Sequence, residues 1–381
     1  MTAKERMLTA MRNKQPDMVP VAPDMSNMIP AKLTGKPFWD IYLYRNPPLW
    51  KAYIDAVRHF GIDGWLASID GQIFENYYPQ PDYKTENVIV FRNEERIITR
   101  VYSEKEKGKK EWSDFIMVYY VKDPPTYLKA SKIGMQAPPE KWWPIEGVKP
   151  EKKDEALLAE VKEYMGDDGV SAVGCCPPQL SNPEGGGYSV FDYYDRYKEV
   201  KEWSERATED ILKRLKKVLS AQSRPDFILT GGSGMLVFMT PKIARDISLP
   251  ALKKITKMCK DAGVPTQIHC CGPERALVEM CANETDLTSI NPLEIPPMGD
   301  CDLAEIKRSF GKKLSLMGNL HTTQVMLRGT AADVKNASKK AIDDAAAGGG
   351  FLLSTGDQCG RDTPEENIFA MVETARSYGK Y

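Results

Sequence analysis

The chain has 381 residues, 42% of them hydrophobic, which is enough apolar side chain for one large domain or two ordinary ones. Its 52 Lys and Arg residues against 53 Asp and Glu give a net charge of -1, which excludes a global electrostatic preference for nucleic acid or an anionic membrane. The chain has no run approaching a membrane-spanning length of apolar residues, and its eight cysteines are too sparse for a disulfide scaffold, so we expect a cytoplasmic protein in a reducing compartment.

The N-terminal part of the chain predicts two helices and two strands. Residues 3–13 form a charged, amphipathic pattern that indicates a helix rather than an apolar signal segment, and residues 18–23 follow as a strand. A second helix over 48–60 precedes a second strand over 63–69.

Residues 72–150 break this alternation. The runs 88–91, 96–101 and 115–121 are typical of antiparallel strands, and an aromatic, Pro-rich stretch over 138–144 follows them. We expect residues 72–150 to be an insertion near the mouth of the main domain, where long insertions often determine the substrate. The aromatic residues either line a pocket there or form the core of the inserted subdomain.

From about residue 160 onward, short apolar runs alternate with amphipathic helical runs, as expected of parallel strands covered on both faces. Six such units and the two earlier strands make eight, the number that closes a parallel barrel. We therefore predict an α/β protein, a (β/α)8 TIM barrel that forms a single domain over residues 1–381; a doubly wound open sheet is the structural alternative. The strand runs are 169–175, 226–231, 264–270, 287–291, 313–319 and 350–355, and the helical runs between them are 198–220, 241–262, 272–283, 302–310 and 331–347.

The candidate site residues follow the late strands, at their carboxyl ends. In a closed parallel barrel these ends form the catalytic face, where residues far apart in sequence converge. They are His269 and Cys271, Glu294, Asn319 and His321, and Cys359.

Three of these residues predict a zinc site. His269 and Cys271 are two residues apart, so in an extended segment they lie on the same side and can bind one ion. Cys359 would complete an N/S2 set with an open position, as in catalytic zinc sites, and Glu294 is the candidate for the fourth place until substrate displaces it. Soft ligands favour zinc over magnesium or calcium. The alternative is that the two thiols are buried and inert and that the imidazole is a hydrogen-bonded core side chain.

Other cofactors find little support in the sequence. The chain has no Gly-x-Gly-x-x-Gly motif for a dinucleotide, and none of its three histidines lies in the Asp-x-His-x-x-Gly arrangement of a corrinoid-carrying module. A corrinoid that takes part must therefore be carried by another protein.

Four segments carry a resemblance to a known family: KERMLTAMRNKQPDMVPV, VPTQIHCCGP, LMGNLHTTQVMLRGT and GGGFLLSTGDQCGRDTPEENIFAMVETARSYG. Together they resemble the uroporphyrinogen decarboxylase superfamily over nearly the whole chain except residues 72–150. Decarboxylases and cobalamin-dependent methyltransferases share this fold. The decarboxylases carry an arginine-rich N-terminal loop, and the matching stretch here, APDMSNMIPAKLTGKP, has no arginine, which disfavours a tetrapyrrole substrate.

The resemblance to the methyltransferase branch implies zinc ligands at His269, Cys271 and Cys359 and an additional carboxylate ligand at Glu294. It also implies a corrinoid-binding partner protein that docks at the barrel mouth. We expect Glu294, Asn319 and His321 to act in catalysis, although His321 fits a structural turn histidine as well as a contact to substrate or corrinoid.

Two reactions fit that branch. The preferred one is an O-demethylase type, in which zinc activates a methoxylated aromatic donor and the Co(I) corrinoid takes its methyl group. The aromatic insertion favours this reading. The alternative is methylation of a thiol of the coenzyme M type, with zinc stabilising the thiolate.

Hypotheses of other classes remain beside these. One is a zinc-free, uroporphyrinogen decarboxylase-like lyase that uses Asp24, Asp357 and Arg361, and another is a non-catalytic accessory of a corrinoid protein. We expect no nucleic-acid or membrane partner, and a homodimer is among the assemblies that the sequence permits.

Overall fold

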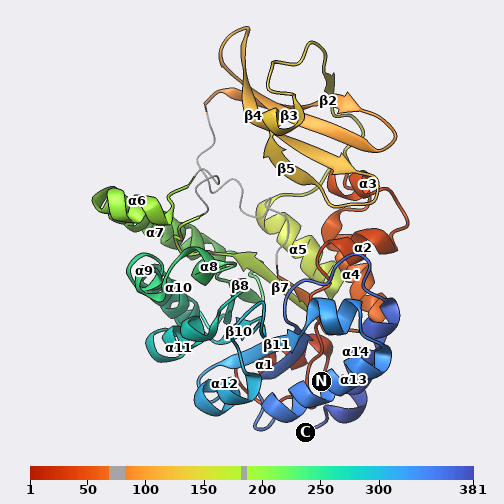
Figure 1. Cartoon of the computed structure of the whole chain (residues 1–381), viewed down its shortest axis with the longest axis vertical. Helices are drawn as coiled ribbons and strands as arrows, with labels where there is room; N and C mark the ends of the chain where they lie inside the picture. Colours follow the sequence, from red (N-terminus) through yellow and green to blue (C-terminus); the bar gives the residue numbers. More distant parts are fainter. Residues whose placement is uncertain (68–81, 182–186) are drawn as a thin grey trace.

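The computed structural model describes residues 1–67, 82–181 and 187–381. Two sheets organise these residues, a parallel sheet surrounded by helices and a smaller antiparallel sheet beside it (Figure 1). In the described ranges, no helix combines the length and apolar character that crossing a membrane requires.

The parallel sheet has seven strands in the order β1-β7-β8-β9-β10-β11-β12, so each strand from β7 onward lies beside the next one in the chain. Short apolar strands in this order are the pattern that right-handed βα units produce. Their bounds are β1 (Gly64–Leu66), β7 (Gly169–Gly174), β8 (Phe227–Leu229), β9 (Thr266–His269), β10 (Ser289–Asn291), β11 (Ser315–Leu320) and β12 (Phe351–Thr355).

The segment predicted as the first strand, residues 18–23, closes this sheet. Val21 bridges Leu353 of β12 in parallel, and the backbone N–H of Ala22 donates to the Leu353 carbonyl at 2.9 Å. On its other side, the Val21 carbonyl accepts from the N–H of Asp63, directly before β1, at 2.8 Å. The segment thus occupies the eighth position, and the predicted TIM-barrel architecture is confirmed. It is not a regular strand, because the Asp63 carboxylate takes the Val21 N–H at 2.8 Å in place of a backbone partner.

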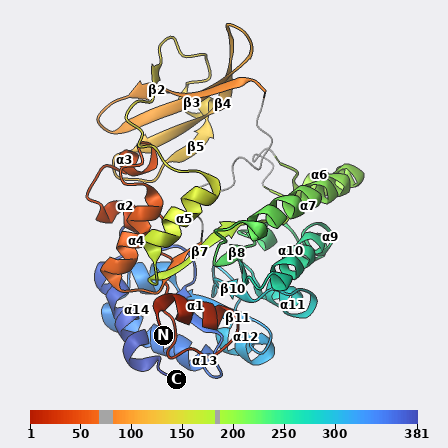
Figure 2. The same ribbon diagram turned by 180° about the vertical axis from the view of Figure 1, so that it is seen from behind.

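Helix α1 (Ala3–Met11) covers one end of the barrel and packs against the side chains inside it. Met7 and Met11 are fully buried and cluster with Trp65, Phe227 and Leu352 on the barrel strands. Figure 2 shows α1 lying across the barrel near β7 and β11. The amino ends of the strands are thereby covered, and the carboxyl ends are left to the loops that carry the candidate site.

Helices cover the outside of the barrel largely where the sequence predicts them. The predicted helix over 241–262 is in fact two helices, because Pro250 lacks a backbone N–H and its ring prevents continuation from the preceding turn. The helix bounds are α2 (Met28–Leu33), α3 (Phe38–Tyr42), α4 (Leu49–Phe60), α5 (Asp154–Met165), α6 (Val190–Asp195), α7 (Tyr197–Ser220), α8 (Met235–Phe238), α9 (Pro241–Ile247), α10 (Leu249–Asp261), α11 (Arg275–Glu284), α12 (Leu303–Phe310), α13 (Ala331–Ala345) and α14 (Glu365–Tyr378), with a 3-10 turn η2 (Ala130–Ile133) and a π-helical turn η4 (Thr322–Leu327).

The antiparallel sheet confirms the predicted inserted β subdomain. Its order is β5-β4-β3-β2-β6, and it has a small core of its own that includes Val88, Ile98 and Ile116. The start of the insertion, predicted at residue 72, and the end of the strand predicted over 63–69 lie outside the described residues. The strands are β2 (Lys84–Arg92), β3 (Arg96–Glu106), β4 (Lys109–Tyr120), β5 (Thr126–Lys129) and β6 (Trp143–Pro144).

The inserted sheet is tied to the barrel by the loop after β12. The Arg361 guanidinium donates to the Lys122 carbonyl at 2.7 Å and pairs with the Asp123 carboxylate. The sequence left open whether the aromatic residues of the insertion line a pocket or pack in the core of the subdomain, and the described residues show both buried and exposed ones. Tyr119 packs in a cluster between the sheet and α3, whereas Trp143 is half exposed.

Candidate metal centre

Three side chains with metal-binding atoms come together at the carboxyl ends of the strands. His269 is the last residue of β9, and its Nε2 lies 3.3 Å from the Sγ of Cys271. The same Nε2 lies 3.6 Å from Oδ1 of Asp357, in the loop after β12. The three ligand atoms lie within 4.8 Å of one another. Imidazole nitrogen, thiol sulfur and carboxylate oxygen can therefore reach a single ion.

The imidazole of His269 is oriented by the neighbouring strand. Its Nδ1 lies 3.1 Å from the side-chain amide nitrogen of Asn291, the last residue of β10. The Asn291 Oδ1 is buried and has no hydrogen-bond partner within the described residues. A rotation of this amide by 180° would let Oδ1 accept from Nδ1–H, which leaves the Nε2 lone pair free to bind a metal.

Cys271 is held from the other side by Ser233. The Ser233 Oγ lies 3.1 Å from the Cys271 Sγ, and burial raises the pKa of this thiol to about 11. The next residue, Gly272, has φ +89°, and a Cβ there would lie 2.8 Å from a methyl carbon of Val237. The glycine is therefore required for the chain to turn away directly after the thiol.

Asp357 is held in a backbone conformation that is unusual for a residue with a Cβ. Its φ is +145°, and its carbonyl accepts from the hydroxyl of Thr355 at 2.7 Å. Backbone strain of this kind is concentrated at functional sites. From the sequence, Asp357 was assigned only to the lyase hypothesis and was missed as a candidate metal ligand. A signal was present, since Asp357 follows the end of β12 by two residues, as Cys271 follows the end of β9.

The structure does not place Cys359 in this group of three. Its side chain is fully buried, burial raises its pKa to about 12, and its backbone N–H donates to the Asp24 carbonyl at 2.8 Å. The charges of Asp24 and Asp357 also raise the pKa of Cys359, so the thiol borders the same centre. Its predicted role as a zinc ligand stays a prediction.

Glu294 flanks the thiol. It is 6% exposed, and its Oε2 accepts the backbone N–H of Gly272. Burial raises the pKa of Glu294, and its charge in turn raises the pKa of Cys271. A carboxylate thus lies near the Cys271 thiol, and its predicted role as a further metal ligand stays a prediction.

The other two predicted catalytic residues are committed to backbone groups. The Asn319 amide donates to the Leu293 carbonyl at 3.1 Å. Nδ1 of His321 accepts from the N–H groups of Thr323 and Gln324 at 3.1 and 3.2 Å, which caps η4. Both side chains line a small cavity together with Glu294. These bonds support the loops around the centre, and a direct part in catalysis remains a prediction.

The residues of the lyase hypothesis have other partners. Asp24 accepts the N–H of Ser26 at 2.8 Å, and burial raises its pKa, partly offset by the nearby His269. The Arg361 guanidinium is engaged by the inserted sheet and by Asp362. This arginine is therefore occupied in holding the insertion.

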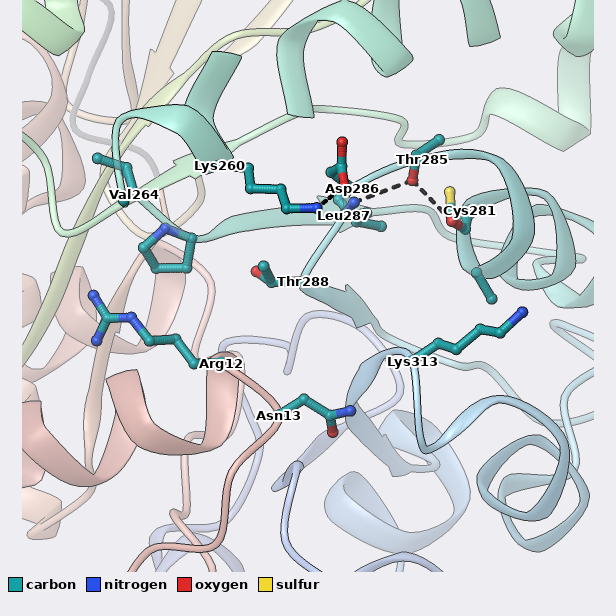
Figure 3. A pocket seen from close by; sticks show the side chains of 13 residues that line it. Arg12, Asn13, Lys260, Val264, Cys281, Thr285, Asp286, Leu287, Thr288 and Lys313 are labelled. Carbon is teal, nitrogen blue, oxygen red and sulfur yellow. Dashed lines mark hydrogen bonds and ion pairs between the residues drawn. The ribbon is translucent and has the colours of Figure 1, made fainter. Parts of the chain in front are cut away.

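A cavity of about 480 Å³ lies at the opposite end of the barrel, at the amino ends of β9 and β10 (Figure 3). Its cations Arg12 and Lys260 lie at the carboxyl-terminal ends of α1 and α10, where positive charge stabilises a helix, and Lys260 also pairs with Asp286. None of the predicted site residues lines it, and a structural role explains its charges.

The fold and the site together define a class of protein. It is a TIM-barrel-like protein with a candidate metal centre at the carboxyl ends of its strands. The uroporphyrinogen decarboxylase (URO-D) family matches residues 192–378, which carry most of these strand ends. This match fits the uroporphyrinogen decarboxylase superfamily, and together with the relatives below it fits the corrinoid methyltransferase branch that the sequence motifs predict.

Two of these relatives are methylcobamide:CoM methyltransferases named MtbA. The one from Methanosarcina mazei is 34% identical over 134 residues, which are 34% of this chain and 35% of the relative. The one from Methanosarcina acetivorans is 32% identical over 131 residues, with 34% and 35% covered. The chain thus matches about a third of the length of these relatives.

A solved structure has the same fold over nearly its whole length. A methyltransferase from Methanosarcina mazei covers 99% of both chains with a TM-score of 0.64, at 16% sequence identity. At this identity the likeness shows the fold alone.

Proposed function

We propose that this chain is a zinc-dependent methyltransferase that exchanges a methyl group with the corrinoid of a separate protein. The observation that carries the proposal is the meeting of His269, Cys271 and Asp357 at the catalytic face of the barrel. The names of the relatives support methyl transfer involving a methylcobamide. A separate corrinoid carrier follows from the lack of a corrinoid-carrying motif in the chain.

The residues present fit zinc. Zinc accepts nitrogen, sulfur and carboxylate oxygen, and in catalytic sites three protein ligands leave a position for substrate. The orphaned Oδ1 of Asn291 fits the same picture, because the tautomer that leaves Nε2 of His269 free has a proton on Nδ1 that needs an acceptor. His269, Cys271 and Asp357 would hold the ion, with Glu294 and Cys359 as the neighbouring candidates for a further ligand.

Zinc in such a site supplies a positive charge that lowers the pKa of a bound thiol or activates the oxygen of a bound ether. The chain supplies the surroundings. Ser233 orients Cys271, and Asn291 orients His269. The Glu294 carboxylate lies near the Cys271 thiol. Within the described residues, the Glu294 carboxylate accepts one hydrogen bond, from the Gly272 N–H, so the carboxylate can move when substrate enters.

For the small substrate, we propose a thiol as methyl acceptor. The two relatives are named methylcobamide:CoM methyltransferases. Their names agree with the second reaction considered from the sequence, methylation of a thiol of the coenzyme M type. In the overall reaction a sulfur–carbon bond forms as the cobalt–carbon bond breaks, the bonding electron pair stays on cobalt, and the thiol proton goes to solvent. The methoxylated aromatic donor remains a prediction. One aromatic residue of the insertion, Trp143, lines a cavity with Tyr44 and Arg92, and none of the three candidate metal ligands lines that cavity.

The test is a two-sided assay with the zinc-loaded protein. Methylcobalamin is incubated with a panel of thiols, and Co(I) corrinoid with methoxyaromatics, methanol and methylamines, while the cobalt absorbance is followed. We expect demethylation of methylcobalamin by at least one thiol and none with Cys271→Ser. Methylcobalamin formation from a methoxyaromatic alone would favour the O-demethylase type, and activity without zinc would contradict both.

A further inference from the structure

Two loops at the metal centre are interlocked by hydrogen bonds. The loop after β9 carries Cys271, and the loop after β10 carries Glu294. The Gly272 N–H donates to the Glu294 carboxylate, and in the opposite direction the Leu293 N–H donates to Oε2 of Glu274 at 2.7 Å. Each loop therefore holds the other by one backbone N–H and one carboxyl group.

The turn that presents Glu294 is held in a strained conformation. Leu293 has φ +60°, a region that side chains with a Cβ rarely adopt. Its N–H is bound by Glu274, and its carbonyl accepts from the Asn319 amide at 3.1 Å. The Glu294 carbonyl accepts from the N–H of Cys301 at 3.0 Å. A turn of this kind persists because its surroundings bind it on several sides.

Glu274 is not explained by its own helix. It occupies the N-cap position of α11, but its side chain makes no capping hydrogen bond. It is fully buried instead, and its Oε1 has no partner within the described residues. Burial raises the pKa of this carboxyl well above its usual range. A buried carboxyl with one unsatisfied oxygen is costly for the fold, and such groups are expected where they serve a site.

We infer that Glu274 is a positioning residue of the metal centre: by accepting the Leu293 N–H, it holds the turn that places the Glu294 carboxylate beside Cys271. The inference rests on one part of the proposed function, namely that the centre binds a metal. Glu274 itself acts through Leu293 and Glu294. Outer partners of this kind change metal affinity by about 10- to 100-fold when they are lost.

The experiment compares three variants of the full chain. Glu274→Gln keeps an acceptor oxygen for Leu293, Glu274→Leu fills a similar volume without an acceptor, and Glu279→Gln alters an exposed glutamate of the same helix as the control. Zinc affinity is measured by competition with a chromophoric chelator, and the absorption spectrum of the Co²⁺-loaded protein reports the ligand geometry. Circular dichroism and thermal melting establish that each variant is folded.

We expect Glu274→Leu to weaken zinc binding by about 10- to 100-fold and to shift the Co²⁺ spectrum. Glu274→Gln should stay close to the unsubstituted protein, and Glu279→Gln should match it. If Glu274→Leu does not fold, we measure Glu274→Ala in the same way. This smaller side chain also removes the acceptor, and it leaves a cavity instead of introducing a side chain of different shape.

The outcomes separate this inference from the proposed function. A protein that binds zinc while Glu274→Leu keeps its full affinity and spectrum overturns the positioning role and leaves the proposed function in place. An unsubstituted protein that binds neither zinc nor Co²⁺ overturns both. Equal losses in Glu274→Gln and Glu274→Leu would also overturn the role, because the acceptor oxygen would then not be what matters.

Discussion

The side-chain amide of Asn291 lies 3.1 Å from Nδ1 of His269 and joins the end of β10 to the end of β9. The other amide atom, Oδ1, is buried without a partner in the described chain. With the amide turned over, Oδ1 would accept from Nδ1–H and fix the tautomer whose Nε2 faces Cys271 and Asp357. Metal-binding histidines usually have such an acceptor on the second ring nitrogen.

This relationship gives a first prediction. Asn291→Leu removes the acceptor at similar size, and we expect zinc affinity to fall by about 10- to 100-fold because the imidazole loses its fixed tautomer and orientation. Asn291→Asp, which keeps an acceptor oxygen, serves as the control and should retain most of the affinity. Chelator competition measures both. Unchanged affinity in Asn291→Leu would mean that the amide does not orient the ligand.

Metal binding should release a proton from Cys271. Burial raises the pKa of this thiol to about 11 in the metal-free chain, so it is protonated at neutral pH, and zinc must displace the proton. Below that pKa, affinity should rise by about tenfold per pH unit for each proton displaced. Calorimetry in buffers of different ionisation enthalpy counts the protons. Cys271→Ser should abolish this release, and zinc binding with no proton release would contradict the thiol as a ligand.

The relative weight of Asp357 and Cys359 can be measured directly. The structure brings the Asp357 carboxylate within reach of Nε2 of His269, whereas the sequence assigned the third ligand to Cys359. We expect Asp357→Asn to lower zinc affinity more than Cys359→Ser does. The sulfur-to-Co²⁺ charge-transfer band counts thiol ligands, so its partial loss in Cys359→Ser would show that Cys359 binds the metal as the sequence predicts.

Glu294→Gln tests the flanking carboxylate. The substituted amide keeps an oxygen that can accept the Gly272 N–H, so the loop should stay in place. We therefore expect a smaller loss of zinc affinity than for Cys271→Ser, together with a clear loss of turnover if Glu294 takes part in exchanging substrate. Equal turnover in Glu294→Gln and the unsubstituted protein would assign Glu294 a structural role.

Barrel closure depends on Asp63. This fully buried carboxylate accepts the Val21 N–H at 2.8 Å and pairs with the Arg6 guanidinium at 2.6 Å. Asp63→Ala removes the acceptor of the Val21 N–H and leaves the buried Arg6 with Asp17 as its remaining carboxylate partner, so it should lower the free energy of unfolding by about 3 kcal/mol. Urea denaturation measures the change, with Asp261→Ala, at an exposed ion pair, as the control. A loss as small as in the control would contradict this role of Asp63.

The sequence predicted the barrel and part of the site for identifiable reasons. Alternating apolar and amphipathic runs report βα units directly, and the spacing of His269 and Cys271 at a strand end places both on one side. The choice between Asp357 and Cys359 depends on the turn after β12, where φ is +145° at Asp357, and no periodicity encodes that turn. The contacts of Asn291 and Glu274 join separate loops, so only the folded chain shows them.

The most direct test of the account is the zinc content of the purified protein, measured beside Cys271→Ser by mass spectrometry under non-denaturing conditions. We predict one zinc ion per chain in the unsubstituted protein and its loss in the variant, with a circular dichroism spectrum showing that the barrel stays folded. A protein that takes up no zinc, or a Cys271→Ser variant that binds it as tightly, would contradict it.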